Sequence, residues 1–138
     1  MYLFLSAQDI QQLEVGFLDE QGYTAFFSSV PTPPEMFLFH VDRLMHEWKI
    51  EWKTILGVAV VVGPGSFTST RLSVTMANGI AFARHIPIIG VENIERLSLS
   101  VLLSDRDWIP FFHAQKIETF VVPIYDRPPL ITLKKIPV

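Results

Sequence analysis

The residues best placed for chemistry lie where a buried strand is predicted to end. A run of small and β-branched residues over positions 57–62 stops at Gly63-Pro64-Gly65, and a helical pattern follows. A strand, a glycine turn and a helix start bring free backbone N–H groups to one place, where they can bind an anion. The candidate phosphate-binding residues are Gly63, Gly65, Ser66 and Thr68.

The same turn has a purely structural interpretation, in which Gly63 and Gly65 let the strand and the helix pack closely. The turn lacks the lysine of a P-loop and matches dinucleotide-binding motifs only weakly. Ser66 lies outside a G-x-S-x-G sequence and has no identifiable base, so N-capping is its favoured role, and Thr68 is a second candidate N-cap. The packing interpretation is favoured for the chain alone. A nucleotide site completed by a partner, with Arg71 assisting, stays open.

Neither metal-dependent nor nucleophilic catalysis is indicated. Enzymes that hold divalent ions at the ends of neighbouring strands need several carboxylates there. Here the first predicted strand runs into Ser6-Ala7-Gln8, with Asp9 as the one acidic residue nearby. The histidines at positions 40, 46, 85 and 113 lack metal-ligand spacing, and the absence of cysteine excludes disulfides and thiol catalysis. We therefore predict no metal site and no catalytic residue.

Hydrophobic patterns predict the elements that position these residues. Three strands come first, and a polar loop at 19–22 joins the last two as a hairpin. Strands and helices then alternate, and further strands close the chain. The predicted strands are 2–5, 13–18, 23–29, 56–62, 87–91, 108–113, 117–125 and 130–134, and the predicted helices are 35–49, 68–84 and 92–103.

This order of elements predicts an α/β fold. A three-stranded antiparallel meander followed by β-α-β-α crossovers is the order of a ribonuclease H-like, or actin-like, sheet. The chain of 138 residues is long enough for one ordinary domain and too short for two. We expect that domain over residues 1–104 and a short, strand-rich remnant of a second domain over residues 105–138.

Composition favours a soluble cytoplasmic protein with a protein partner. A net charge of −3 gives no electrostatic footprint for nucleic acid. The apolar stretch at positions 1–5 lacks a basic flank and is too short for a signal peptide or a membrane span. Because 49% of the residues are hydrophobic and only 18% are charged, apolar surface is left over after the core is filled, which is typical of an interface.

The helix predicted over 68–84 is the strongest candidate for that interface. It has no charged residue between Arg71 and Arg84, whereas a helix with one buried face carries charges on the other. On the helix at 35–49, the residues Phe37, Leu38, Val41, Leu44, Met45 and Trp48 form the expected core stripe, and Met36 and Phe39 fall outside it. Enclosure of the second helix within its own fold remains an alternative. The candidate partner-binding residues are Met36, Phe39, Arg43, Arg71, Leu72, Thr75, Met76, Gly79, Ile80 and Ala83.

Part of the chain resembles a known family. The segments Gly63-Pro64-Gly65-Ser66-Phe67-Thr68-x-x-Arg71, Ala77-x-Gly79-Ile80-Ala81 and Pro87-x-Ile89-Gly90-Val91 are similar to the bacterial TsaB (YeaZ) family, the non-catalytic partners of the TsaD threonylcarbamoyltransferase. The resemblance covers residues 57–97. It implies an actin-like fold and a scaffold role in making threonylcarbamoyladenosine at position 37 of tRNA. It also implies docking to TsaD through the helices at 35–49 and 68–84, and recruitment of the ATPase TsaE by that heterodimer.

Four departures from the family pattern fall near the expected nucleotide site and the second domain. Ser6-Ala7-Gln8 stands where the family usually has Asp-Thr-Ser, and Pro33-Pro34-Glu35 replaces a His-Ser/Thr pair. Ser69 replaces a glycine, and His113-Ala114-Gln115 replaces the Asp-Ala-Arg that opens the second domain. These differences indicate a reduced member that binds no cofactor by itself, with ATP or ADP bound only together with a partner.

The sequence therefore favours a non-enzymatic scaffold subunit that docks a TsaD-like protein, or a second copy of this chain when that protein is absent. A TsaE-like ATPase would be an indirect partner. Two alternatives stay open: a phosphotransferase or ATPase of the actin-like group that uses the glycine turn, and a degenerate paralogue with another protein partner.

Overall fold

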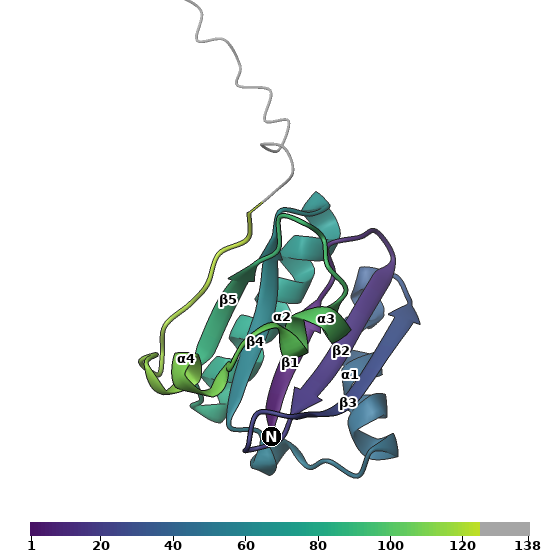
Figure 1. Cartoon of the computed structure of the whole chain (residues 1–138). Helices are drawn as coiled ribbons and strands as arrows, with labels where there is room; N and C mark the ends of the chain where they lie inside the picture. Colours follow the sequence, from purple (N-terminus) through teal and green to yellow (C-terminus); the bar gives the residue numbers. More distant parts are fainter. Residues whose placement is uncertain (125–138) are drawn as a thin grey trace, which may run out of the picture.

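A five-stranded sheet forms the centre of the computed structural model, which describes residues 1–124 (Figure 1). The strands lie in the order β3-β2-β1-β4-β5, with antiparallel β1–β2 and β2–β3 pairs and parallel β1–β4 and β4–β5 pairs. The predicted meander and crossovers are thereby confirmed. The strands are β1 (Tyr2–Ser6), β2 (Gln12–Leu18), β3 (Thr24–Pro31), β4 (Gly57–Gly63) and β5 (Ile88–Glu92).

Helices cover both faces of this sheet. On one face lie the 3-10 turn η1 (Pro34–Met36), α1 (Phe37–Glu47) and α2 (Phe67–Arg84), and on the other lie α3 (Leu99–Asp105) and α4 (Ile109–His113) (Figure 1). Each face has its own apolar core. Alternate residues of β1 and β2 pack against α1 and α2, and Tyr2 and Phe4 pack against α3 and α4. Because β1 and β4 are covered on both sides, they consist almost entirely of apolar residues.

The second half of the chain departs from the predicted elements. The predicted strand at 108–113 is wrong, because Ile109–His113 forms α4, whose Phe112 packs on Tyr2 with ring centroids 4.5 Å apart. The helix predicted over 92–103 is also too long. Asn93 closes a loop by accepting a hydrogen bond from the Leu97 amide and donating one to its carbonyl, so the helix starts only at Leu99.

Residues 114–124 run back along the β5 side of the sheet without forming a helix or a strand (Figure 1). The strand predicted over 117–125 is therefore wrong for residues 117–124, and residue 125 lies outside the described residues. In its place, two hydrogen bonds join Asn78 to the backbone of Val121, and the Ile124 amide donates to the Val62 carbonyl. The strand predicted over 130–134 lies outside the described residues, and the boundary drawn at residue 104 stays a prediction.

Candidate functional site

A groove of about 920 Å³ lies between α1 and α2. Its walls come from these helices, from η1, and from a second 3-10 turn, η2 (Trp52–Thr54). The lining is mostly apolar: Leu38 and Phe39 on α1 are 54% and 56% exposed. The lining residues are Pro34, Glu35, Phe37, Leu38, Phe39, Asp42, Trp52, Leu72, Thr75, Met76, Gly79, Ile80, Ala83 and Arg84.

Small residues on α2 keep this groove open. Thr75, Gly79 and Ala83 are exposed and recur every four residues, so they line one side of the helix. A Cβ placed at Gly79 would meet no atom within 4 Å apart from its two chain neighbours and the backbone of its own helix. Gly79 is therefore not required by packing within this chain, and the space beside it faces the groove.

Seven of the ten predicted partner-binding residues line the groove: Phe39, Leu72, Thr75, Met76, Gly79, Ile80 and Ala83. Met36, Arg43 and Arg71 do not. Met36 is 38% exposed on η1. The Arg43 guanidinium lies 2.6 Å from the Glu47 carboxylate, and that of Arg71 lies over the Phe67 ring, 5.1 Å from its centroid.

Seven of the fourteen lining residues were not among the predicted partner-binding residues: Pro34, Glu35, Phe37, Leu38, Asp42, Trp52 and Arg84. Leu38 was assigned to the core stripe of its helix, which is wrong because more than half of the side chain is exposed. Asp42 and Trp52 were not singled out; the Trp52 indole donates a hydrogen bond of 3.1 Å to the Asp42 carboxylate, which fixes η2 against α1. The adjacent apolar pair Leu38-Phe39 was the available signal, since one helix face cannot bury both.

The chain's own residues fill the glycine turn. The Ser66 amide donates to the Gln8 carbonyl, and the Gln8 side chain donates to the carbonyls of Pro64 and Asn93 at 2.7 and 2.9 Å. A Cβ at Gly65 would lie 2.9 Å from the Gln8 Cα, and one at Gly63 would overlap the Ile124 carbonyl. These contacts favour the packing interpretation of the two glycines.

The N-cap position predicted for Ser66 is confirmed, and the one predicted for Thr68 is wrong. Ser66 occupies the N-cap position of α2, but its side chain makes no capping hydrogen bond, and its hydroxyl is buried without a partner among the described residues. Thr68 lies within the helix. A phosphate-binding role for Gly63, Gly65, Ser66 and Thr68 stays a prediction, although the Ser66 amide that it requires is already bonded.

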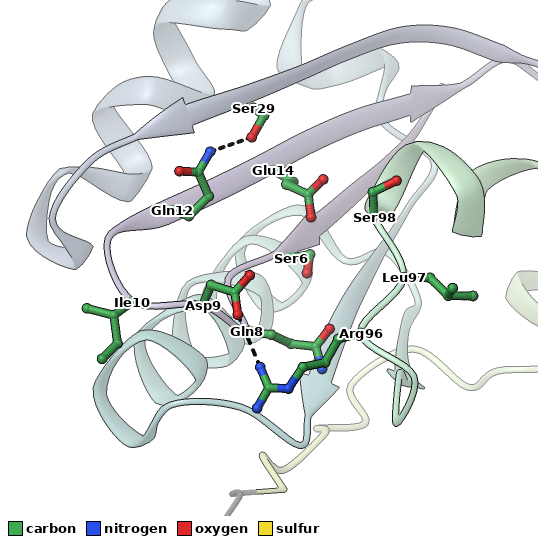
Figure 2. A pocket seen from close by; sticks show the side chains of 10 residues that line it. All are labelled: Ser6, Gln8, Asp9, Ile10, Gln12, Glu14, Ser29, Arg96, Leu97 and Ser98. Atoms are coloured by element: carbon green, nitrogen blue, oxygen red, sulfur yellow. Dashed lines mark hydrogen bonds and ion pairs between the residues drawn. The ribbon is translucent and has the colours of Figure 1, made fainter.

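A polar pocket of about 430 Å³ lies beyond the end of β1 (Figure 2). Asp9 and Arg96 form an ion pair of 3.2 Å across it, and Gln12 donates a hydrogen bond to Ser29. The Glu14 carboxylate accepts a hydrogen bond of 3.1 Å from the Leu99 amide, yet burial raises the pKa of this group above its ordinary value. No group of three metal-ligating side chains occurs within residues 1–124.

The segment that forms the groove is similar to a known protein family. Residues 35–122 match the family described as TsaD, tRNA N6-adenosine threonylcarbamoyltransferase, and this segment is more than half of the chain. The chain belongs to this family. The segment includes α1, α2 and every residue of the groove except Pro34.

The curated relatives of this chain carry two different protein names. The chain is 34% identical over 73 residues to a tRNA N6-adenosine threonylcarbamoyltransferase of Geobacter sp. (strain M21), covering 53% of this chain and 21% of the relative. It is 29% identical over 80 residues to the tRNA threonylcarbamoyladenosine biosynthesis protein TsaB of Bacillus subtilis (strain 168), covering 58% of this chain and 35% of the relative. The chain thus spans well under half of these curated relatives.

Solved structures show the same fold. YeaZ from Pseudomonas aeruginosa superposes with a TM-score of 0.62 at 24% identity, over 75% of this chain and 50% of that one. This likeness shows the fold, an actin-like, ribonuclease H-like sheet. Within the TsaD family, the TsaB relatives make the chain similar to the TsaB/YeaZ-like members. No helix within residues 1–124 is long and apolar enough to cross a membrane.

Proposed function

We propose that this chain is a non-catalytic subunit in the biosynthesis of threonylcarbamoyladenosine on tRNA, and that it docks a TsaD-like transferase through the groove between α1 and α2. The observation that carries the proposal is the uncovered apolar lining of this groove. Relatives named TsaD and TsaB, which share sequence with this chain, support the pathway.

The shape of the groove favours a helix as its occupant. Its α2 wall runs from Leu72 to Arg84, a length of about 18 Å at 1.5 Å per residue, which is more than three helical turns. An amphipathic helix binds in such a groove through apolar residues at i, i+3 and i+4 spacing. The small residues on α2 allow its backbone to approach closely, and the exposed rings and methyl groups of α1 supply the apolar contact.

Charged residues lie at the margins of the groove. Glu35 and Asp42 line the α1 side, and Arg84 lies at the end of α2. Such charges set the orientation and the rate of association more than the affinity. We expect the partner helix to carry basic residues opposite Glu35 and Asp42, with its apolar face toward Gly79.

The test is co-purification with the TsaD-like protein of the same organism, using Gly79→Leu. The added side chain enters the groove, where its Cβ meets no atom within 4 Å apart from its chain neighbours and the backbone of its own helix, so the monomer should fold normally. Leucine also favours a helix over glycine by about 1 kcal/mol, so the unfolding temperature should stay level or rise. We expect the co-purified partner to fall by at least about tenfold.

A matched control adds the same side chain elsewhere. Ser104→Leu places a leucine on the exposed surface of α3, on the other face of the sheet, and should leave co-purification unchanged. Full retention of the partner by Gly79→Leu would contradict docking through this groove. Loss of the partner in both variants would indicate non-specific aggregation.

Nucleotide binding separates this proposal from its enzymatic alternative. We propose that the isolated chain binds ATP and ADP weakly or not at all and that a nucleotide site forms only with the partner, since Gln8 occupies the glycine turn. A TsaE-like ATPase would then bind to the complex rather than to this chain alone. Calorimetry with Mg-ATP and ADP tests the point: micromolar binding by the isolated chain would favour a phosphotransferase or ATPase.

A further inference from the structure

Three polar side chains form a row across the sheet on the face opposite the groove. Ser6 on β1 pairs with Glu14 on β2, and Glu14 pairs with Ser29 on β3. Residues directly opposite each other in antiparallel strands project from the same face, so these side chains are neighbours at the edge of the polar pocket (Figure 2). Gln12 on β2 projects from the same face, and further along the strands this face is mainly apolar, with Tyr2, Phe4 and Leu18 in its core. The row therefore interrupts an apolar surface at one place.

Ser6 is the least satisfied member of this row. Its residue is 3% exposed and lines the pocket, and its hydroxyl makes no hydrogen bond to any described residue. The neighbouring Gln8 differs, because its amide is fully used in bonds to Pro64 and Asn93. The Ser6 oxygen is not fully enclosed and can be reached from the pocket, so a ligand there would supply a hydrogen bond to it.

The other polar atoms of the pocket are mainly acceptors. One carboxylate oxygen of Glu14 accepts the Leu99 amide, and the second has no partner among the described residues. Gln12 donates its amide nitrogen to Ser29, and one oxygen of Asp9 accepts from Arg96. Two carboxylates and one guanidinium line the space, which leaves an excess of negative charge.

We propose that this pocket binds a small organic cation through its ammonium group, which the Glu14 carboxylate and the Ser6 hydroxyl hold. An ammonium group has three N–H donors and no acceptor, which matches a pocket rich in acceptors. The excess of negative charge disfavours a free anion. A volume of about 430 Å³ is adequate for a small molecule.

The environment of Glu14 adds support. Burial is the main cause of its raised pKa, with the nearby Asp9 charge acting in the same direction and the Leu99 hydrogen bond opposing both. A half-buried carboxylate that lacks a cation of its own gains more from a bound ammonium than a solvated one does. The Arg96 guanidinium forms an ion pair with Asp9 at 3.2 Å.

The experiment is an NMR titration of the full chain with methylammonium and with putrescine, followed through the backbone amides of Ser6, Gln12 and Glu14. We expect saturable shifts at these residues. Binding should weaken by about tenfold in Glu14→Gln, which keeps an acceptor for Leu99 but removes the charge, and by about fivefold in Ser6→Ala. The exposed hairpin variant Glu20→Gln, which removes the same charge outside the pocket, should bind as the unaltered chain does.

Several results would overturn the proposal. One is the absence of saturable shifts up to about 50 mM of either amine, a concentration far above that of a specific site. Another is equal binding by Glu14→Gln and the unaltered chain. A third is saturation by Mg²⁺ at the same residues while methylammonium has no effect, which would assign a divalent cation. Ser6→Ala removes no hydrogen bond between described residues, so this variant should fold. Its amine binding therefore tests the proposal even if Glu14→Gln does not fold, and unchanged binding would contradict a role for the Ser6 hydroxyl.

Discussion

Leu38 and Leu44 lie on the same helix in opposite environments. Leu44 is 3% exposed and belongs to the core between α1 and the sheet, whereas Leu38 is 54% exposed and lines the groove. The same residue type therefore serves the fold at one position and is available to a partner at the other.

This contrast gives a paired prediction. Leu44→Ala should lower the free energy of unfolding by about 2–5 kcal/mol, because it leaves a cavity in a closed core. Leu38→Ala should change it by less than about 0.5 kcal/mol, yet weaken binding of the TsaD-like partner. Urea denaturation and co-purification of both variants make the comparison. A strongly destabilised Leu38→Ala variant would show that Leu38 belongs to the core.

Helical periodicity could not distinguish these two leucines. Leu38 lies one residue after the buried Phe37, at the margin of the apolar stripe. Whether that margin is covered depends on the size of the side chains on the neighbouring helix. Because α2 presents Gly79 and Ala83 there, Leu38 stays open. The sequence identified the stripe of small residues on α2. It could not show that this stripe leaves Leu38 exposed, because that depends on how the two helices pack.

Glu14 gives a prediction about pH. Its pKa in the folded chain is raised above the ordinary value of 4.5, so the folded state holds this proton more tightly than the unfolded state does. The contribution of this group to stability must therefore fall as pH rises from about its ordinary pKa through the raised one. Glu14→Gln cannot lose a proton, so its stability relative to the unaltered chain should increase across that interval.

Urea unfolding at about pH 4 and about pH 7 measures this difference. We expect the free energy of unfolding of Glu14→Gln, relative to that of the unaltered chain, to be higher at about pH 7 than at about pH 4. Glu20→Gln is the surface control. A relative loss for Glu14→Gln as pH rises would mean that the ionised carboxylate stabilises the fold, through its hydrogen bond with the Leu99 amide.

At the scale of the elements, one side chain attaches the end of the described chain to α2. The Asn78 amide donates to the Val121 carbonyl at 2.9 Å, and its oxygen accepts from the Val121 amide at 3.0 Å. This pair of bonds replaces the backbone ladder that a strand would provide. Val121 also packs against the main core and would contact a Cβ at Gly90 on β5.

Asn78→Ala should therefore release this segment while the sheet remains intact. We expect the Val121 amide to exchange with solvent about 10–100 times faster, since both bonds are lost, with strand β4 still protected. Asn78→Asp retains the acceptor for the Val121 amide and should give a smaller change. Unchanged exchange in Asn78→Ala would show that packing of Val121 alone holds the segment.

The sequence predicted the strands of the sheet better than the elements that follow it. Continuous apolar residues in β1 and β4 identify strands covered on both faces, and such a pattern is independent of distant contacts. The five residues of α4 contain two phenylalanines, a composition typical of a strand. They are too few to show a helical period, and the helix forms because Phe112 fills a space beside Tyr2 and Phe4.

At the scale of the whole molecule, the two candidate sites lie on opposite faces of one sheet. The groove arises between helices that lie close together in the sequence, so its α2 half could be predicted from the helical pattern. The polar pocket depends on the register of three strands and on a loop near residue 96, contacts that no local pattern contains. In the structure, Glu14 lies on the face of β2 opposite Val15, and its neighbours come from β1 and β3.

The open groove predicts the oligomeric state of the isolated chain. Without a partner, the apolar side chains of α1 and α2 face water, and burying them against a second copy of the chain recovers about 25 cal/mol for each Å² of apolar surface covered. We therefore expect self-association through the groove, in competition with the TsaD-like protein.

Light scattering should show a mass that rises with concentration, and Leu38→Glu should restore the monomer by placing a charge in the contact. Ile94→Glu, at a position 73% exposed and outside the groove, is the control and should associate as the unaltered chain does. A strict monomer at high concentration would contradict self-association through the groove.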